Sequence, residues 1–403
     1  MKAVTPFFRI AQCALYIGQK FVKYRRPLVI ESGDFPSSLI SVLKANNIYR
    51  PFFVTGPNIY KKGLCEPYIK ALKDNGLSPF IFTDTKSNPT FDEIYVGRTL
   101  AKKNNCDCII VLGGGSVIDT GKLIGVLLKS LRKSLHSFRG ILTVHHPLPF
   151  FVSIPTTAGS GSEASISAVV TNPKTHQKFA VSSPQLVSDV ILLDPSLLVR
   201  CPKKTIAESG MDAMSHALES YLSRYKNGRA ASNSLFALRL ISENLLDFYH
   251  NPTLDKASLL LKASMLSGEA ISVNYVGYVH ALAHALGGKT NLSHGKLIAA
   301  FILPVFRAYG DKAYDSFERI HDALSLGSPT DTKKEKAEKV LTFIEDFIRA
   351  LGLSLKLPIT LNNDEIKYLA RAACKEANPI YPVPKILTAK ELEGLIREVV
   401  NVK

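Results

Sequence analysis

The chain lacks the features that would set it apart from ordinary globular proteins. No uninterrupted apolar run approaches the roughly 20 residues that span a bilayer, and there is no internal repeat or low-complexity segment. Its six cysteines form no paired framework, and Cys106-Asp-Cys108 is too tightly spaced for an ordinary zinc knuckle. We therefore expect a cytoplasmic protein whose cysteines are reduced core thiols.

Signals of nucleic-acid recognition are also missing. There is no zinc finger, no ladder of basic and aromatic residues and no run typical of RNA-binding domains. The formal net charge of +16 favours non-specific attraction of polyanions, but the charge is dispersed along 403 residues. We therefore expect no specific nucleic-acid partner.

The first 26 residues form a distinct basic segment with six positive charges and no acidic residue. An apolar stripe at helical spacing predicts a helix here, ended by Arg25-Arg26-Pro27. The stripe consists of Phe7, Ile10, Ala14, Ile17 and Phe21. Two interpretations stay open: the stripe packs on the protein body or a second subunit, or it makes weak peripheral contact with a membrane.

From residue 28, short apolar runs alternate with segments of helical periodicity. The expected strands are 28–31, 52–55, 80–83, 108–112, 150–154 and 190–193, and the first four are separated by helices at 36–47, 61–75 and 91–104. This alternation predicts an α/β domain with a doubly wound, Rossmann-like parallel sheet. Residues 168–171 and 178–181 are expected to pair as a hairpin with its turn at 173–177.

After Asp194-Pro195 the pattern changes to long segments with a period of 3.6 residues. These expected helices are 205–223, 229–248, 254–273, 278–287, 297–309, 335–352, 364–374 and 389–401, and strand runs disappear. We therefore divide the chain into a basic extension (1–26), an α/β domain (27–198) and an all-helical domain (199–403).

Two polar loops leave predicted strands of the α/β domain. Gly113-Gly114-Gly115-Ser116 follows one strand and opens a helix, so that backbone N–H groups and the helix dipole favour an anion. This is neither the GxGxxG fingerprint nor a Walker loop, and a tight turn is the alternative. The second loop, residues 155–165, is rich in Ser, Thr and Gly. At the carboxyl edge of one parallel sheet, both loops would face a nucleotide-binding crevice.

The helical domain contains a cluster of candidate metal ligands. Asp212 and His216 are four residues apart, as are His280 and His284, and His294 follows. Residues at this spacing share one face of a helix. Carboxylate and imidazole groups suit Fe(II) or Zn(II). Surface or core histidines are the plainer alternative, but the whole set predicts a metal site in which all the histidines are equally eligible as ligands.

Taken together, four segments resemble the iron-containing (group III, metal-dependent) alcohol dehydrogenase family. They are GGGSVIDTGK at 113–122, PTTAGSGSEAS at 155–165, ESGMDAMSHALESY at 208–221 and HALAHALGGKTNLSHG at 280–295. The resemblance extends in order from about residue 27 to 400. It implies a dehydroquinate synthase-like architecture, in which a dinucleotide-binding domain precedes a helical domain that holds one divalent metal, Fe(II) or Zn(II), in the interdomain cleft. It also implies a homodimer or larger assembly.

The resemblance assigns roles by position. Metal ligands would be Asp212, His216, His280 and His294, while His284 matches an active-site histidine that is not a ligand. The positions implied to contact the cofactor are Gly114, Gly115 and Ser116 at the pyrophosphate, Asp119, Thr156, Thr157 and Lys178 near the ribose and nicotinamide, and Ser165 in the second loop.

The implied reaction is hydride transfer between NAD(H) or NADP(H) and a primary alcohol or aldehyde on a Lewis-acidic metal, with His284 relaying the hydroxyl proton. A reductase of an acidic carboxy- or phosphono-aldehyde is the first alternative, because the positive chain attracts anions. A non-redox metal lyase or synthase of related architecture is the second.

The chain departs from the family pattern at two places. NAD-preferring relatives usually carry an Asp after the second strand, where this chain has Gly56, with Lys61 and Lys62 downstream. Without that carboxylate a 2′-phosphate is not repelled, so we expect NADP(H) to be accepted and even preferred. Tyr275 and Tyr278 replace small or aliphatic residues. They either shape the substrate pocket or pack between helices.

Overall fold

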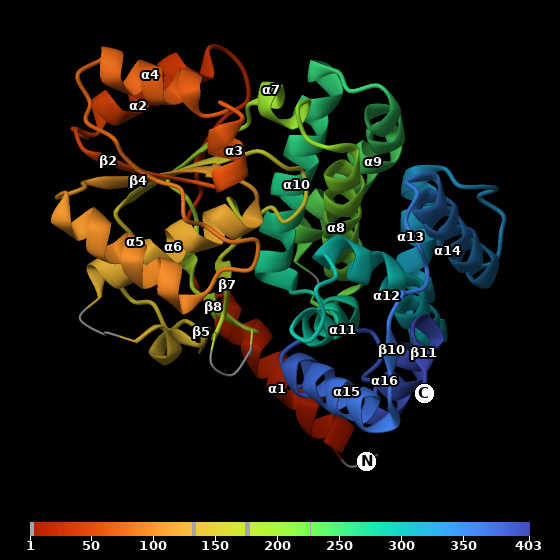
Figure 1. Cartoon of the computed structure of the whole chain (residues 1–403). Helices are drawn as coiled ribbons and strands as arrows, with labels where there is room; N and C mark the ends of the chain where they lie inside the picture. The colour runs from red at the N-terminus through yellow and green to blue at the C-terminus, as the bar shows by residue number, and fades with distance from the viewer. Residues whose placement is uncertain (1–3, 131–133, 174–177, 226) are drawn as a thin grey trace. The chain divides into compact units, whose positions relative to one another are not determined.

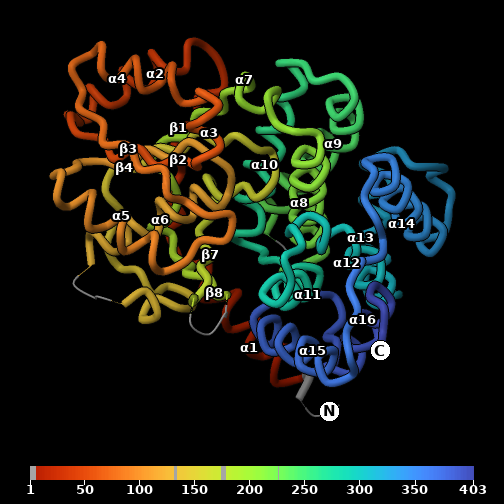
Figure 2. Tube along the Cα trace, viewed as in Figure 1, coloured from red at the N-terminus to blue at the C-terminus, as the bar shows by residue number. Residues whose placement is uncertain are grey.

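The computed structural model describes residues 4–130, 134–173, 178–225 and 227–403, and the chain divides into two compact units (Figures 1 and 2). The sheet unit is Lys23–Cys201, and the helical unit is Met1–Val22 with Pro202–Lys403. The division after Cys201 falls where the pattern changes from strands to helices. The basic segment 1–26 is split between the units, and most of it belongs to the helical one.

The sheet unit is built on six parallel strands in the order β1-β9-β6-β4-β2-β3. Their bounds are β1 (Leu28–Ile30), β2 (Pro51–Thr55), β3 (Phe80–Phe82), β4 (Cys108–Gly113), β6 (Phe150–Pro155) and β9 (Val190–Leu192). The helices of this unit are α2 (Phe35–Ala45), α3 (Pro57–Lys61), α4 (Glu66–Asp74), α5 (Phe91–Lys103), α6 (Gly115–Lys129) and α7 (Pro195–Leu198). This confirms the expected doubly wound α/β fold.

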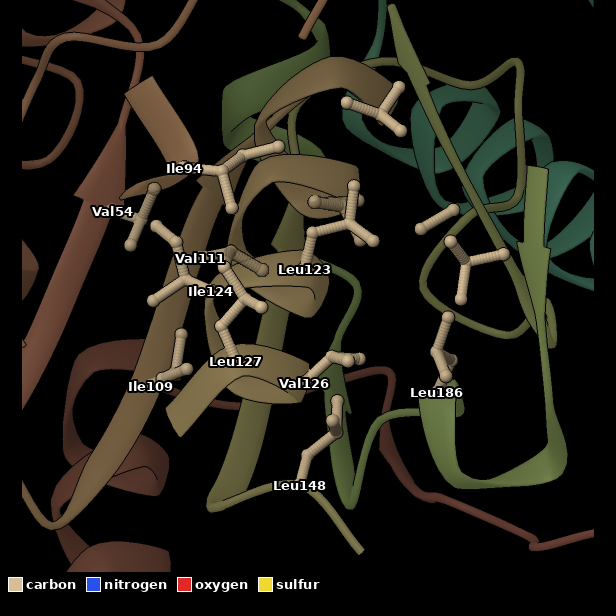
Figure 3. Packing of buried hydrophobic residues seen from close by; sticks show 14 of the residues in the cluster. Val54, Ile94, Ile109, Val111, Leu123, Ile124, Val126, Leu127, Leu148 and Leu186 are labelled. Atoms are coloured by element: carbon tan, nitrogen blue, oxygen red, sulfur yellow. The ribbon is translucent and has the colours of Figure 1, made fainter. Parts of the chain in front are cut away.

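Alternate side chains of the central strands supply two hydrophobic cores, one on each face of the sheet. Val54, Ile109 and Val111 point into the core formed with α5 and α6 (Figure 3). Phe53 and Ile110 point into the opposite core, formed with α2 and α4. Because both faces are buried, the strands read in the sequence as continuous apolar runs.

A smaller sheet accompanies the main one. β7 (Ser167–Thr171) and β8 (Lys178–Ser182) are antiparallel, as expected, and β5 (Gly140–Ile141) pairs with β8 in parallel. Of the turn expected at 173–177, residues 174–177 lie outside the described part of the chain. Residues 140–141 are too short a strand to produce a periodic signal in the sequence.

The helical unit contains α1 and most of the chain after residue 202. Its helices are α1 (Val4–Gln19), α8 (Lys203–Leu222), α9 (Gly228–His250), α10 (Leu254–Asn274), α11 (Tyr278–Gly287), α12 (His294–Tyr309), α13 (Tyr314–Leu324), α14 (Lys333–Ala350), α15 (Asn363–Ala377) and α16 (Ala389–Val399). The sequence pattern did not indicate α13, a short helix that buries Phe317 and Ile320. The expectation that strands disappear is wrong, because β10 (Thr360–Leu361) and β11 (Asn401–Val402) pair in parallel.

The N-terminal helix differs from its expected form in two ways. It ends at Gln19, well before Arg25-Arg26-Pro27. Its apolar stripe does not pack on the described part of the chain, since Phe7, Ile10, Ile17 and Phe21 are exposed. Its opposite face is hydrogen-bonded instead, because Arg9 and Gln12 donate to backbone carbonyls of residues 381–384. None of the described helices combines the length and hydrophobicity that crossing a membrane requires. No two of the six cysteines form a disulfide. Only Cys65 and Cys108 are buried in the core, Cys106, Cys201 and Cys374 are partly buried and Cys13 is exposed, so the expected core position holds for two of the six.

A close contact between α6 and the central strand yields a stability prediction. A Cβ at Gly121 would lie 2.2 Å from Val111 Cγ1, whereas a Cβ at Gly394 in α16 would meet no atom within 4 Å. We expect Gly121→Ala to lower the free energy of unfolding by about 1–3 kcal/mol through overpacking. Gly394→Ala should raise it by about 0.5–1 kcal/mol through helix propensity. Urea unfolding followed by circular dichroism measures both, and equal effects would contradict the packing argument.

Candidate metal and nucleotide sites

Three helices of the helical unit bring the candidate metal ligands together. Asp212 and His216 lie one turn apart on α8, His280 lies on α11, and His294 is the first residue of α12. The next residue, Gly295, allows α12 to begin directly against α8, because a Cβ there would lie 2.3 Å from the Glu208 carbonyl oxygen. A glycine at this position therefore brings the His294 ring within reach of Asp212.

The distances within this cluster match those of a coordination shell. Asp212 Oδ1 lies 3.3 Å from His294 Nε2, 3.5 Å from His280 Nε2 and 3.9 Å from His216 Nε2. Ligand atoms held tetrahedrally about 2.0–2.2 Å from a metal are about 3.3–3.6 Å apart. The ligand atoms of Asp212, His280 and His294 all lie within 4.8 Å of one another, and the His216 ring stacks on His280 with centroids 4.5 Å apart. The residues therefore fit a divalent metal.

Burial sharpens this fit. Asp212 Oδ1 and His280 Nε2 are buried and have no hydrogen-bond partner among the described residues, which is costly unless a cation satisfies them. Burial raises the pKa of Asp212, but the facing imidazoles of His216 and His294 lower it well below its usual range. Burial lowers the pKa of His280, yet the facing carboxylates of Asp212 and Glu219 raise it to about 9. These shifts mean that Asp212 is ionised and that the cluster stabilises positive charge beside its carboxylate.

Glu219 orients one of the ligands from behind. Its Oε2 lies 2.6 Å from His280 Nδ1, and its Oε1 accepts the backbone N–H of Val279 at 2.9 Å. The carboxylate is buried. It therefore holds the proton on Nδ1, turns Nε2 towards Asp212 and raises the basicity of the ring, as carboxylates do behind metal-bound histidines.

His284 lies beside the cluster but outside the compact group of ligand atoms. Its ring stacks on His294 with centroids 5.4 Å apart. Its Nδ1 lies 2.7 Å from Glu376 Oε1, which also accepts the Tyr381 hydroxyl at 2.9 Å. The His284 side chain is 25% exposed. An imidazole held by a carboxylate at the margin of a buried cluster can exchange a proton with water or substrate.

The two predicted nucleotide loops meet in the sheet unit at the carboxyl edge of the sheet. The Thr156 N–H donates to the Gly113 carbonyl at 3.1 Å. A Cβ at Gly114 would lie 3.2 Å from Thr157 Oγ1, and one at Gly115 would lie 2.5 Å from Ser160 Oγ. The glycines therefore permit the close approach of the second loop, and Gly115 opens α6 with its N–H groups at the helix N-terminus.

A buried lysine, which the sequence analysis did not single out, ties these loops together. The Lys122 ammonium donates to the carbonyls of Ser162, Ser165 and Ser167 at 2.5, 2.7 and 3.1 Å. Burial lowers its pKa to about 8, while Asp119 and Glu163 act in the opposite direction. Lys122 therefore links α6 to the end of the second loop.

Asp119 and Ser165 belong to the same internal network. Asp119 accepts the Ser162 hydroxyl at 2.6 Å and the Val169 N–H at 3.0 Å. The Ser165 hydroxyl donates to the Ser167 carbonyl at 3.1 Å. These contacts give both residues a role in shaping the loops. Their predicted cofactor contacts stay predictions.

The remaining nucleotide candidates lie at the same unit's loops. Gly56 follows β2 and precedes α3, and a Cβ there would make ordinary contacts of 3.6–3.7 Å with Thr85 and Val117. Ser116 is half-buried in the first turn of α6. Lys178 begins β8, where its ammonium donates to Asn88 Oδ1 at 2.6 Å and burial lowers its pKa. Gly56 is thus adjacent to the first loop, because Thr55 pairs with Leu112 of β4.

One candidate for the substrate pocket has a structural role. Tyr278 is completely buried, and its hydroxyl lies 3.0 Å from Asn378 Oδ1 and accepts the Leu387 N–H at 3.0 Å. It therefore packs between elements of the helical unit, the second of the two interpretations offered above. Tyr275 ends α10 at a positive φ of 60°, with its ring 6.0 Å from that of Tyr225.

Two further residues escaped the sequence analysis for different reasons. Glu219 lies three residues after His216 on the same helix, so its helical spacing was a usable signal. Glu376 is separated from His284 by 92 residues, and no local pattern connects them.

Comparisons with known proteins agree along most of the chain. The family described as iron-containing alcohol dehydrogenase matches residues 29–195, and the C-terminal part of the Fe-containing alcohol dehydrogenase family matches residues 206–400. A 1,3-propanediol dehydrogenase from Citrobacter freundii is 32% identical, over 85% of this chain and 89% of the relative. A choline dehydrogenase from Bacillus subtilis is 29% identical, over 95% and 96%.

Solved structures show the same similarity. A 1,3-propanediol oxidoreductase has a TM-score of 0.88 at 28% identity and covers 94% of this chain and 99% of that chain. An alcohol dehydrogenase from Oenococcus oeni has a TM-score of 0.89 at 27% identity and covers 94% and 100%. The two units thus share their folds with structures of this kind.

The metal cluster yields a binding prediction. We expect Asp212→Asn to abolish stoichiometric metal binding, because it removes the only carboxylate of the set. Elemental analysis after reconstitution with Fe(II) or Zn(II), and the rise in Tm that either metal produces, measure the effect. Asp247→Asn, which removes an exposed carboxylate of α9, is the matched control and should behave as wild type. Wild-type metal content in Asp212→Asn would refute the assignment.

A substitution of Glu219 tests whether this residue orients His280 without itself binding the metal. We expect Glu219→Gln to weaken Zn(II) affinity by about 10–100-fold while leaving a site that still fills at high metal concentration. Competition with a chromophoric chelator measures the dissociation constant. Glu243→Gln, on the exposed part of α9, should leave it unchanged. An unaltered affinity in Glu219→Gln would show that the carboxylate does not tune His280.

Proposed function

Because the chain belongs to the iron-containing alcohol dehydrogenase family, we propose that it is a metal-dependent, NAD(P)-linked enzyme that interconverts a primary alcohol and its aldehyde. The observation that carries this proposal is the buried Asp212 carboxylate facing three imidazoles at 3.3–3.9 Å. The glycine loops of the sheet unit supply the second requirement, a surface for a dinucleotide pyrophosphate.

In the direction of reduction, the aldehyde gains a hydride from NAD(P)H and a proton, which yields the primary alcohol and NAD(P)⁺. When bound, the divalent metal supplies a Lewis acid and the nicotinamide supplies the hydride. Asp212, His216, His280 and His294 hold the metal, and Glu219 keeps His280 in the tautomer that presents Nε2.

His284 has the role of moving the hydroxyl proton. Glu376 holds its Nδ1 at 2.7 Å, which leaves Nε2 for the proton that the substrate oxygen gains or loses. The pair is positioned like other imidazole–carboxylate couples that act as acid and base. His284 therefore differs in function from the three histidines of the ligand set.

The substrate class follows in part from the relatives. Those named above are called 1,3-propanediol and choline dehydrogenases, and another is called an NAD-dependent methanol dehydrogenase. These names support a small primary alcohol. The net charge of +16 favours an acidic aldehyde as the second candidate. A cytoplasmic location and a homodimeric or larger assembly stay predictions.

A cofactor-by-substrate matrix tests the proposed activity. The protein is stripped of metal and reconstituted anaerobically with Fe(II), or separately with Zn(II). It should then consume NADH or NADPH, measured as a fall in absorbance at 340 nm, with butanal, 3-hydroxypropanal or betaine aldehyde. Succinic semialdehyde and phosphonoacetaldehyde test the second candidate. We expect metal removal to abolish turnover and readdition to restore it. Conversion of substrate without any change in NAD(P)H would instead favour a lyase or synthase.

Gly56 yields a prediction about the nucleotide. We propose that NADP(H) is accepted, and preferred, because no carboxylate follows β2. Gly56→Asp should lower kcat/KM for NADPH at least about tenfold and spare NADH, because a carboxylate repels the 2′-phosphate. Gly56→Asn, of the same size without the charge, separates repulsion from steric effects. Wild-type kcat/KM favouring NADH tenfold over NADPH would overturn the preference.

A further inference from the structure

The N-terminal helix is fastened to the helical unit by its polar face. The Arg9 guanidinium donates to the carbonyls of Val383 and Pro384 at 2.8 and 2.9 Å. The side-chain amide of Gln12, which is buried, donates to the Tyr381 carbonyl at 2.8 Å, and the Gln12 backbone carbonyl accepts the Tyr225 hydroxyl at 2.8 Å. Burial, followed by repulsion from Arg224, lowers the pKa of Arg9 to about 10, so it stays charged at neutral pH.

These bonds determine which side of α1 faces outward. The opposite side carries Phe7, Ile10 and Ile17, and Phe21 continues the same spacing just beyond the helix. We call these four residues the outer stripe. These four residues are 57–83% exposed. Apolar side chains gathered on one face indicate a contact surface, whereas singly scattered ones do not. Rotating the helix to bury the outer stripe would break the four polar contacts of Arg9 and Gln12.

The segment that carries the outer stripe has only positive charges in its sequence. The first 26 residues contain no acidic residue. Lys20 is exposed next to Phe21, and Lys23 and Arg26 follow in the sequence, whereas Arg25 between them forms an ion pair with Asp189. Apolar side chains on one face with basic residues at its end are the pattern of helices that lie in the interface of anionic membranes.

The same charges argue against a second copy of the chain as the occupant. In a two-fold interface the same patch meets itself, so two uniformly basic segments would be brought together and would repel. Four exposed side chains on one helix also fall short of the roughly 800 Å² per partner that a stable interface buries. An anionic lipid surface instead gains from both the apolar area and the charge.

We propose that α1 docks the protein on an anionic phospholipid bilayer, with the outer stripe inserted at the boundary between headgroups and acyl chains. The helix lies in the plane of the surface and does not cross it. The polar contacts of Arg9 and Gln12 keep the helix attached to the helical unit while its other face enters the lipid.

Co-sedimentation with vesicles tests this docking on the full chain. We expect binding to phosphatidylcholine vesicles that contain about one quarter phosphatidylglycerol, little binding to pure phosphatidylcholine, and loss of binding at about 0.5 M NaCl. Phe7→Asn/Ile17→Asn should lower the partition coefficient at least about tenfold. Phe236→Asn/Leu254→Asn removes two comparably exposed apolar residues from α9 and α10 and should bind as wild type.

Further measurements distinguish a loss of membrane binding from unfolding and from the loss of a dimer contact. Both double variants should retain wild-type circular dichroism and metal content, which shows that they are folded. Lys20→Gln/Lys23→Gln should lower binding to the anionic vesicles about tenfold or more. The proposal is overturned if the wild type binds neither vesicle, or if both double variants lose binding equally. It is also overturned if Phe7→Asn/Ile17→Asn only converts a dimer into a monomer, since the outer stripe would then contact a second copy.

Discussion

A buried carboxylate that requires positive charge around it is the constraint on which the helical unit depends. Asp212 lies at the meeting point of α8, α11 and α12, and one of its oxygens has no hydrogen-bond donor among the residues that the structure describes. Burying such a group without compensation is destabilising. The approach of α12 through Gly295, the support of His280 by Glu219 and the stacking of the histidine rings all serve the same requirement. The contacts that pack these helices together are therefore the same contacts that form the metal-ligand cluster.

The sheet unit also contains a buried charged group, but a positive one, Lys122. The Lys122 ammonium is withdrawn from water and satisfied by three carbonyls of a loop that lies some forty residues later in the chain. A buried cation with such partners holds the backbone in place, because leaving any of the partners unpaired is costly. This holds the second loop against the glycines of the first.

The orientation of α1 shows what hydrophobic periodicity in a sequence can predict and what it cannot. Apolar spacing separated two faces of the helix correctly, but it could not determine which face would be buried. Residues 381–384 include two prolines and form no helix or strand, so their carbonyls have no regular backbone ladder to join. Arg9 and Gln12 satisfy three of those carbonyls. Hydrogen bonding to distant backbone thus outweighed burial of the apolar stripe.

The sequence by itself determined the parallel sheet, the change to helices after residue 195, the two glycine- and serine-rich loops and the set of candidate ligands, because each of these leaves a local periodic or motif signal. Only the tertiary structure decided that Tyr278 is a packing residue and that Asp119 and Ser165 shape the loops. It also decided that Glu376 supports His284 and that α1 turns its apolar stripe outward. The Ser165 hydroxyl bonds only two residues along the chain, but the other polar groups have partners far away in the sequence. No local pattern records which of those donors and acceptors folding will bring together.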